Sequence, residues 1–214
     1  LTKWFSNSGR FCTAGSVSST SSMRLAEAED RIPLDSFINC LYNSAEQFLL
    51  KKKSFTGILA GFPWHGVRGR DTFISLPGLT LSTGRSDLAF DVIKSMVAKL
   101  KNGLFPNSPL QDDQDYSAVD TPLWFIWSLQ QLEKYEEIDV WKNFGPAIRQ
   151  IIDAYMNGTL YGIRMDESGL IYAGDASLPL TWMDSIVFGQ RVIKRRALLV
   201  EVNALWYNAV CQII

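Results

Sequence analysis

The sequence is poor in the residues that build metal sites and disulfide frameworks. It has one histidine and three cysteines, and the cysteines stand far apart at positions 12, 40 and 211 with no CxxC spacing. This pattern argues against a zinc site and a disulfide framework, and the single histidine excludes a histidine-rich metal centre. We therefore expect a protein without a bound metal or cofactor.

Long apolar runs and an excess of charge of one sign are also missing. No run reaches the roughly 18 apolar residues of a membrane span, and the opening letters LTKWFSNSGR lack an apolar signal core. Lysine and arginine number 21 against 22 aspartates and glutamates, a net charge of -1. We expect no nucleic-acid partner, no membrane association and a cytoplasmic protein.

Helical periodicity is the main structural signal in the chain. Apolar residues recur at helical spacing in six segments, and long loops separate several of them. The predicted helices cover about 35–53, 72–82, 86–101, 122–135, 141–157 and 201 or 203 onward. The remaining segments are a loop over 57–70, a strand-and-turn region over 158–172, and mostly loop over 173–200 with a hairpin inside 187–200. Because strands do not alternate with helices, the pattern predicts an all-α fold. The serine-rich residues 1–33 are expected to form a linker.

Four carboxylates stand inside clusters of aromatic, glycine and proline residues. The clusters read GFPWHGVRGRDTF, DYSAVDTPLW, LPLTWMDS and VEVNALWYNA, and their acids are Asp71, Asp120, Asp184 and Glu201. Carboxylates protonate glycosidic oxygens, activate water and hold hydroxyl groups, while flat aromatic rings pack on the apolar faces of sugars. The repeated pairing indicates a carbohydrate-active enzyme.

Each carboxylate also has an ordinary structural interpretation. Asp120 precedes Pro122 at a helix start, so it is a candidate N-cap residue. Asp71 has the same interpretation for the helix after it, Asp184 stands in a loop that a buried Trp182 would anchor, and a lone Glu201 at a helix start faces solvent by default. A helix N-terminus also favours the ionised form of Asp120, whereas a general acid needs a raised pKa. From the residues alone, both interpretations stay open.

The order of the motifs resembles a known family. GFPWHGVRGRDTFISLPGLTLSTGR looks like the signature of amylo-alpha-1,6-glucosidases, the C-terminal domain of glycogen debranching enzymes. YSAVDTPLWFIWSLQQ, LTWMDS and VEVNALWYNA are similar to later signatures of that domain, in the same order. The resemblance covers roughly residues 37–210.

The resemblance implies an activity and a role for each motif residue. It implies hydrolysis, with inversion, of the α-1,6-linked glucose at glycogen branch points, so a branched α-glucan is the expected partner. Asp120 would be the general acid, and Arg70 with Asp71 would grip the terminal glucose. The other residues expected to line the glucose pocket are Trp64, Trp182, Asp184, Glu201 and Asn203.

The resemblance also implies an (α/α)6 barrel, of which residues 34–214 would be the N-terminal half. We expect the general base, and the rest of the barrel, beyond Ile214. Departures from the family pattern stand at His65, Val67, Arg68 and Ser117, and they affect fine contacts. The alternative is a non-catalytic carbohydrate-binding or structural half-barrel that lacks its base.

Overall fold

The computed structural model describes residues 36–174, 178–183, 185–188, 190–192 and 195–212, so the predicted linker over 1–33 lies outside the described residues. About half of the described residues are helical. The α-helices are α2 (Phe37–Glu46), α3 (Gly69–Leu79), α4 (Ser86–Val97), α5 (Thr121–Tyr135), α6 (Val140–Asn157) and α7 (Val200–Cys211). Two 3₁₀ turns, η2 (Leu81–Thr83) and η3 (Leu160–Gly162), complete the helical elements.

The prediction of an all-α fold is wrong, because about 14% of the described residues lie in β-strands. One three-stranded antiparallel sheet contains β1 (Leu49–Lys52), β2 (Phe55–Gly61) and β3 (His65–Val67). A second contains β4 (Arg164–Met165), β5 (Ile171–Ala173) and β8 (Ala197–Leu198), and β6 (Ile186–Val187) pairs with β7 (Gln190–Arg191). The protein therefore has mixed α and β structure.

The first sheet replaces the end of one predicted helix and the loop predicted over 57–70. Leu49 and Leu50 are buried, whereas Lys51 and Lys52 of the same strand are exposed. The lysines therefore lie in a strand, although the sequence pattern placed them at a helix end. In β2 the run from Phe55 to Leu59 is fully buried against α3 and α4, and this burial stabilises a strand despite its two glycines.

The helices match the sequence pattern better than the strands do. Helices α5 and α6 begin and end within one residue of the predicted segments, and the predicted strand-and-turn region contains β4 and β5. Helix α3 begins at Gly69, before the predicted start, and contains Pro77. The predicted hairpin is present as β6 and β7, a few residues earlier than expected.

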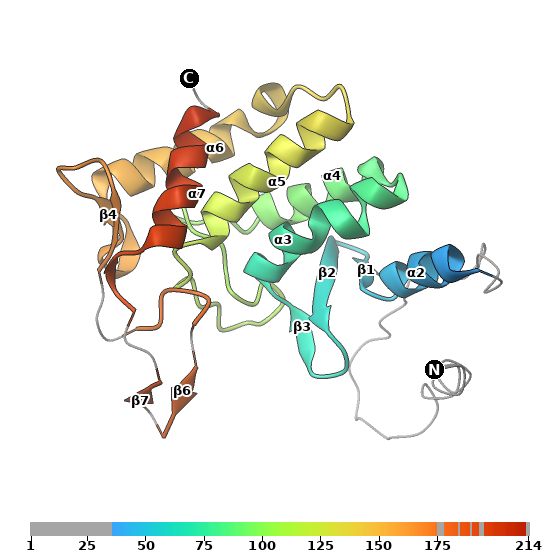
Figure 1. Cartoon of the computed structure of the whole chain (residues 1–214), viewed down its shortest axis with the longest axis horizontal. Helices are drawn as coiled ribbons and strands as arrows, with labels where there is room; N and C mark the ends of the chain where they lie inside the picture. The colour runs from blue at the N-terminus through green and yellow to red at the C-terminus, as the bar shows by residue number, and fades with distance from the viewer. Residues whose placement is uncertain (1–35, 175–177, 184, 189, 193–194, 213–214) are drawn as a thin grey trace.

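Helix α5 lies at the centre of the packing. It contacts α3, α4, α6 and α7, and α3, α5 and α7 lie side by side (Figure 1). Three buried rings join α3 to α5: Phe73 packs against Phe105 and Phe125 with ring centroids 5.0 and 5.4 Å apart. On the other side of the molecule, Tyr155 of α6 stacks on Trp206 of α7. Among the described residues, no helix is long and apolar enough to cross a membrane.

Candidate functional site

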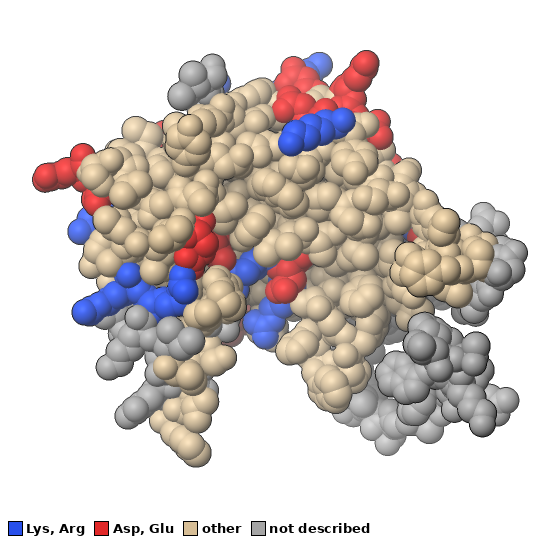
Figure 2. Space-filling view, in the orientation of Figure 1, with Lys and Arg blue, Asp and Glu red and all other residues tan. Residues whose placement is uncertain are grey.

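Three helix starts bring charged residues of distant motifs together. Arg70 lies in the first turn of α3, Asp120 directly precedes α5, and Glu201 lies in the first turn of α7. In Figure 1 these three starts lie on the side of the molecule from which the β2–β3 and β6–β7 hairpins project. Figure 2 shows acidic and basic side chains close together on that side, whereas most of the surface above them is uncharged.

Asp120 forms an ion pair with Arg70. The Arg70 Nε–H donates to both carboxylate oxygens, at 3.0 Å to Oδ1 and 2.8 Å to Oδ2. Asp120 is 3% exposed, and its side chain makes no capping hydrogen bond to the backbone of α5. The N-cap interpretation therefore fails for the Asp120 side chain, because the carboxylate is directed toward α3.

The pKa of Asp120 is raised above its usual value of 3.8, chiefly because burial removes the carboxylate from water. The Arg70 guanidinium acts in the opposite direction through its charge and its hydrogen bond, and the negative charge of Glu201 adds to the increase. Burial thus outweighs the Arg70 ion pair. A buried carboxyl group with a raised pKa is suited to donate a proton.

The backbone of Val119, directly before Asp120, is fixed by two hydrogen bonds. The Val119 N–H donates to the Leu180 carbonyl at 2.9 Å, which ties the loop of the LTWMD motif to the Asp120 segment. The Tyr155 hydroxyl donates to the Val119 carbonyl at 2.5 Å. Burial, with a smaller contribution from the Asp120 charge, raises the pKa of Tyr155 well above 10.0. The phenol therefore stays protonated and keeps donating this hydrogen bond.

Arg195 connects two of the predicted site residues. Its Nη2 forms an ion pair with the Glu201 carboxylate, and its guanidinium carbon lies 6.0 Å from the centroid of the Trp182 ring. Trp182 is 53% exposed, so its ring is accessible beside this ion pair. Glu201 has a charged partner and is not the solvent-facing residue that a lone glutamate would be.

Asn203 holds the second sheet against α7. Its Oδ1 accepts from the Ile171 N–H at 2.7 Å, and its Nδ2 donates to the Ile171 carbonyl at 3.2 Å and the Leu199 carbonyl at 3.0 Å. One turn later, the Trp206 indole N–H donates to the Gly169 carbonyl. These contacts give Asn203 a structural task, and its contact with glucose stays a prediction.

Two predicted site residues lie apart from the Asp120–Arg70 pair. Asp71 is exposed and lines a cavity of about 240 Å³ between β2 and α3. Trp64 is 85% exposed at the turn between β2 and β3. The structure brings neither into a contact with Asp120 among the described residues, so their sugar-binding roles stay predictions. Asp184 lies outside the described residues.

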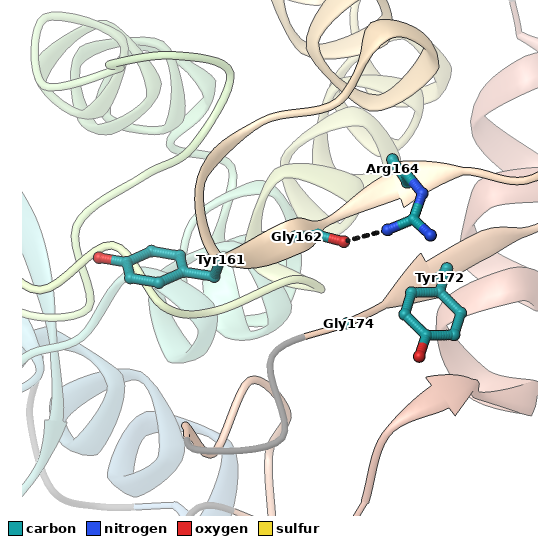
Figure 3. Close-up of a pocket in the computed structure, with 5 residues that line it drawn as sticks. All are labelled: Tyr161, Gly162, Arg164, Tyr172 and Gly174. Atoms are coloured by element: carbon teal, nitrogen blue, oxygen red, sulfur yellow. Dashed lines mark hydrogen bonds between the residues drawn. The ribbon is translucent and has the colours of Figure 1, made fainter.

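A separate cavity of about 390 Å³ opens beside the second sheet. The Arg164 guanidinium lies 4.9 Å from the centroid of the Tyr172 ring and donates weakly to the Gly162 carbonyl, while the Tyr161 ring points away from this pair (Figure 3). Asp120 and Arg70 do not line this cavity.

Sequence reasoning missed Tyr155 and Arg195. Nothing in the helical pattern of 141–157 separates Tyr155 from an ordinary core residue, and Arg195 is one of two adjacent arginines in a segment without periodicity. Within the described ranges, no three His, Cys, Asp or Glu side chains are grouped so that they could hold a metal ion.

Comparison with known proteins identifies the family to which the chain belongs. The family model described as amylo-alpha-1,6-glucosidase matches residues 43–214. A glycogen debranching enzyme of Saccharomyces cerevisiae is 37% identical over 90 residues, which is 38% of this chain and 6% of the yeast protein. The chain thus aligns with a small part of that relative. The match across most of its length shows that the chain belongs to the amylo-alpha-1,6-glucosidase family.

Proposed function

We propose that the protein hydrolyses the α-1,6-linked glucose at branch points of an α-glucan, with Asp120 as the general acid. The observation that carries the proposal is the buried Asp120 carboxyl group, whose pKa is raised although Arg70 binds it. The yeast relative is a glycogen debranching enzyme, which makes glycogen or a limit dextrin the proposed substrate.

In the proposed reaction, the protonated Asp120 gives its proton to the glycosidic oxygen as the bond to the anomeric carbon breaks. Arg70 has two effects on this step. Its guanidinium orients the carboxyl group, and its positive charge favours the carboxylate that remains after proton transfer. Trp182 offers an exposed ring face for the sugar, and the Glu201 carboxylate oxygens accept hydrogen bonds from sugar hydroxyl groups.

Inversion requires a second carboxylate about 6.5–9.5 Å from the acid to activate the attacking water. We propose that this general base lies in a longer protein that contains this chain, as the family resemblance implies. Glu201 is then a glucose-holding residue, in keeping with its ion pair to Arg195. A base outside the chain makes glucose release depend on a longer protein.

Release of free glucose tests the proposal. The chain and the full-length protein that contains it are incubated with a maltooligosaccharide that carries a single 6-linked glucose, and the anomer of the released glucose is followed by NMR. We expect β-glucose from the full-length protein. Absence of glucose release, or release of α-glucose, contradicts the proposed inverting reaction.

The second candidate function is carbohydrate binding without turnover. The exposed Trp64 and Trp182 rings favour it, because exposed indoles bind sugar faces whether or not a general acid and base are both present. The same incubation separates the two candidates. Binding of the oligosaccharide by the full-length protein without any glucose release supports the second.

A further inference from the structure

We propose that Arg195 is a positioning residue, which holds the Glu201 carboxylate and the Trp182 indole together as one sugar-binding surface beside Asp120. The inference deepens the proposed function and rests on it, because it assigns the glucose-binding surface of the same site.

One guanidinium makes three contacts with the two motifs. Its Nη2 binds the Glu201 carboxylate at the start of α7. Its central carbon lies 6.0 Å from the centroid of the Trp182 ring, and its Nη1 lies 3.6 Å from the Met183 Sδ. Trp182 and Met183 belong to the LTWMD motif, and Glu201 belongs to the VEVNALW motif. Arg195 lies in the segment between these two motifs and joins them through its side chain.

This surface lies beside Asp120 for two independent reasons. The Leu180 carbonyl accepts a hydrogen bond from the Val119 N–H, which fixes the loop of Trp182 to the residue before Asp120. Glu201 is near enough for its charge to act on the Asp120 carboxyl group. In the part of the chain that the structure describes, the ionisable groups that act on Asp120 are Arg70 from α3 and Glu201 from α7, and Asp120 in turn acts on Tyr155 from α6.

The chemistry of the site favours arginine over lysine at position 195. A planar guanidinium binds a carboxylate with one edge and lies against an aromatic ring with its face at the same time. A lysine ammonium supplies the charge without the planar face. Lysine at this position should therefore keep the effect of the charge on Glu201 and lose the support of Trp182.

Three variants of the full-length protein test the proposal. Arg195→Met removes the guanidinium and its three contacts, and Arg195→Lys keeps the charge. Arg196→Met is the matched control because Arg196 is exposed. Two quantities are measured: the Kd for D-glucose by tryptophan fluorescence, and the pH dependence of kcat/KM for glucose release. Thermal melting checks the fold of each variant.

We expect Arg195→Met to weaken glucose binding by about tenfold, the effect of losing a charge-assisted contact. It should also move the alkaline limb of the pH profile to higher pH, because an uncompensated Glu201 charge makes Asp120 harder to ionise. In Arg195→Lys the alkaline limb of the pH profile should return to its wild-type position, while glucose binding should remain weak. Arg196→Met should match the wild type in both measurements.

Equal behaviour of Arg195→Met and Arg196→Met overturns the proposal. If Arg195→Met does not fold, Arg195→Lys tests the proposal in its place. Glucose affinity equal to that of the wild type in Arg195→Lys overturns the proposal. Failure of the proposed function is a different result, because the wild-type protein then releases no glucose while the Kd measurements still test Arg195.

Discussion

At the scale of single residues, the site depends on a balance at Asp120. Burial favours the neutral carboxyl group, whereas the Arg70 guanidinium favours the carboxylate, and burial has the larger effect. Helix N-termini favour a negative charge and so act to lower the pKa of a nearby carboxyl group. Asp120 lies among three helix starts and its pKa is raised nevertheless, so burial outweighs them as well. The tension noted in the sequence, between a helix start and a general acid, is resolved by burial.

The Asp120 pKa predicts a specific pH dependence of stability. A carboxyl group whose pKa is higher in the folded state than in the unfolded state binds more protons when folded. Its contribution is therefore most favourable at and below pH 3.8, and it becomes less favourable as the pH rises from 3.8 through the folded pKa. The Asp120→Asn variant lacks this pH-dependent contribution to the free energy of unfolding.

Urea unfolding between pH 4 and pH 7 measures the effect. The free energy of unfolding of the wild type, relative to that of Asp120→Asn, should fall as the pH increases over this range. A difference that stays constant, or that grows with pH, contradicts a raised Asp120 pKa.

At the scale of elements, the sequence predicted long helices well and short strands poorly. In α5 and α6 the apolar period extends over 15 and 18 residues, so the signal is strong. Strand β2 is buried over five consecutive residues, so it shows no alternation of apolar and polar residues, and its two glycines weaken the strand propensity of Phe55, Thr56 and Ile58. Its stability comes from burial against α3 and α4, which are contacts that a local pattern does not contain.

Helix α3 and the residue after it provide a matched pair of buried threonines. Thr72 and Thr80 are both fully buried. The Thr80 hydroxyl donates to the Leu76 carbonyl at 2.6 Å, whereas the Thr72 hydroxyl has no hydrogen-bond partner among the described residues. Valine at position 72 should therefore stabilise the fold by about 1 kcal/mol, because it removes an unsatisfied polar group, and valine at 80 should cost about 1 kcal/mol.

The urea midpoints of the two variants, compared with that of the wild type, check this prediction. The two midpoints should move in opposite directions. Equal destabilisation by both substitutions would show that the Thr72 hydroxyl is satisfied in solution.

At the scale of the whole molecule, the site is built from motifs that the chain separates. Arg70 and Asp120 are 50 positions apart and form one ion pair, and Glu201 reaches the same region from the last helix. The motifs predicted which residues carry chemistry, and those roles stay predictions. The ion pair between Arg70 and Asp120 is a finding of the structure that the sequence did not predict. Arg70 and Asp71 were expected to grip the terminal glucose together, but Asp71 is exposed and lines the cavity between β2 and α3.

The central claim is that Asp120 donates the proton in hydrolysis of the α-1,6 bond. The most direct measurement compares glucose release from a 6-glucosyl maltooligosaccharide by the full-length wild type, Asp120→Asn and the exposed control Asp113→Asn, with substrate binding measured for each. Asn at 120 should lower kcat by about 10²–10⁴-fold, the contribution of a general acid, and leave binding largely intact, while Asp113→Asn matches the wild type. Near-normal turnover by Asp120→Asn would contradict the account.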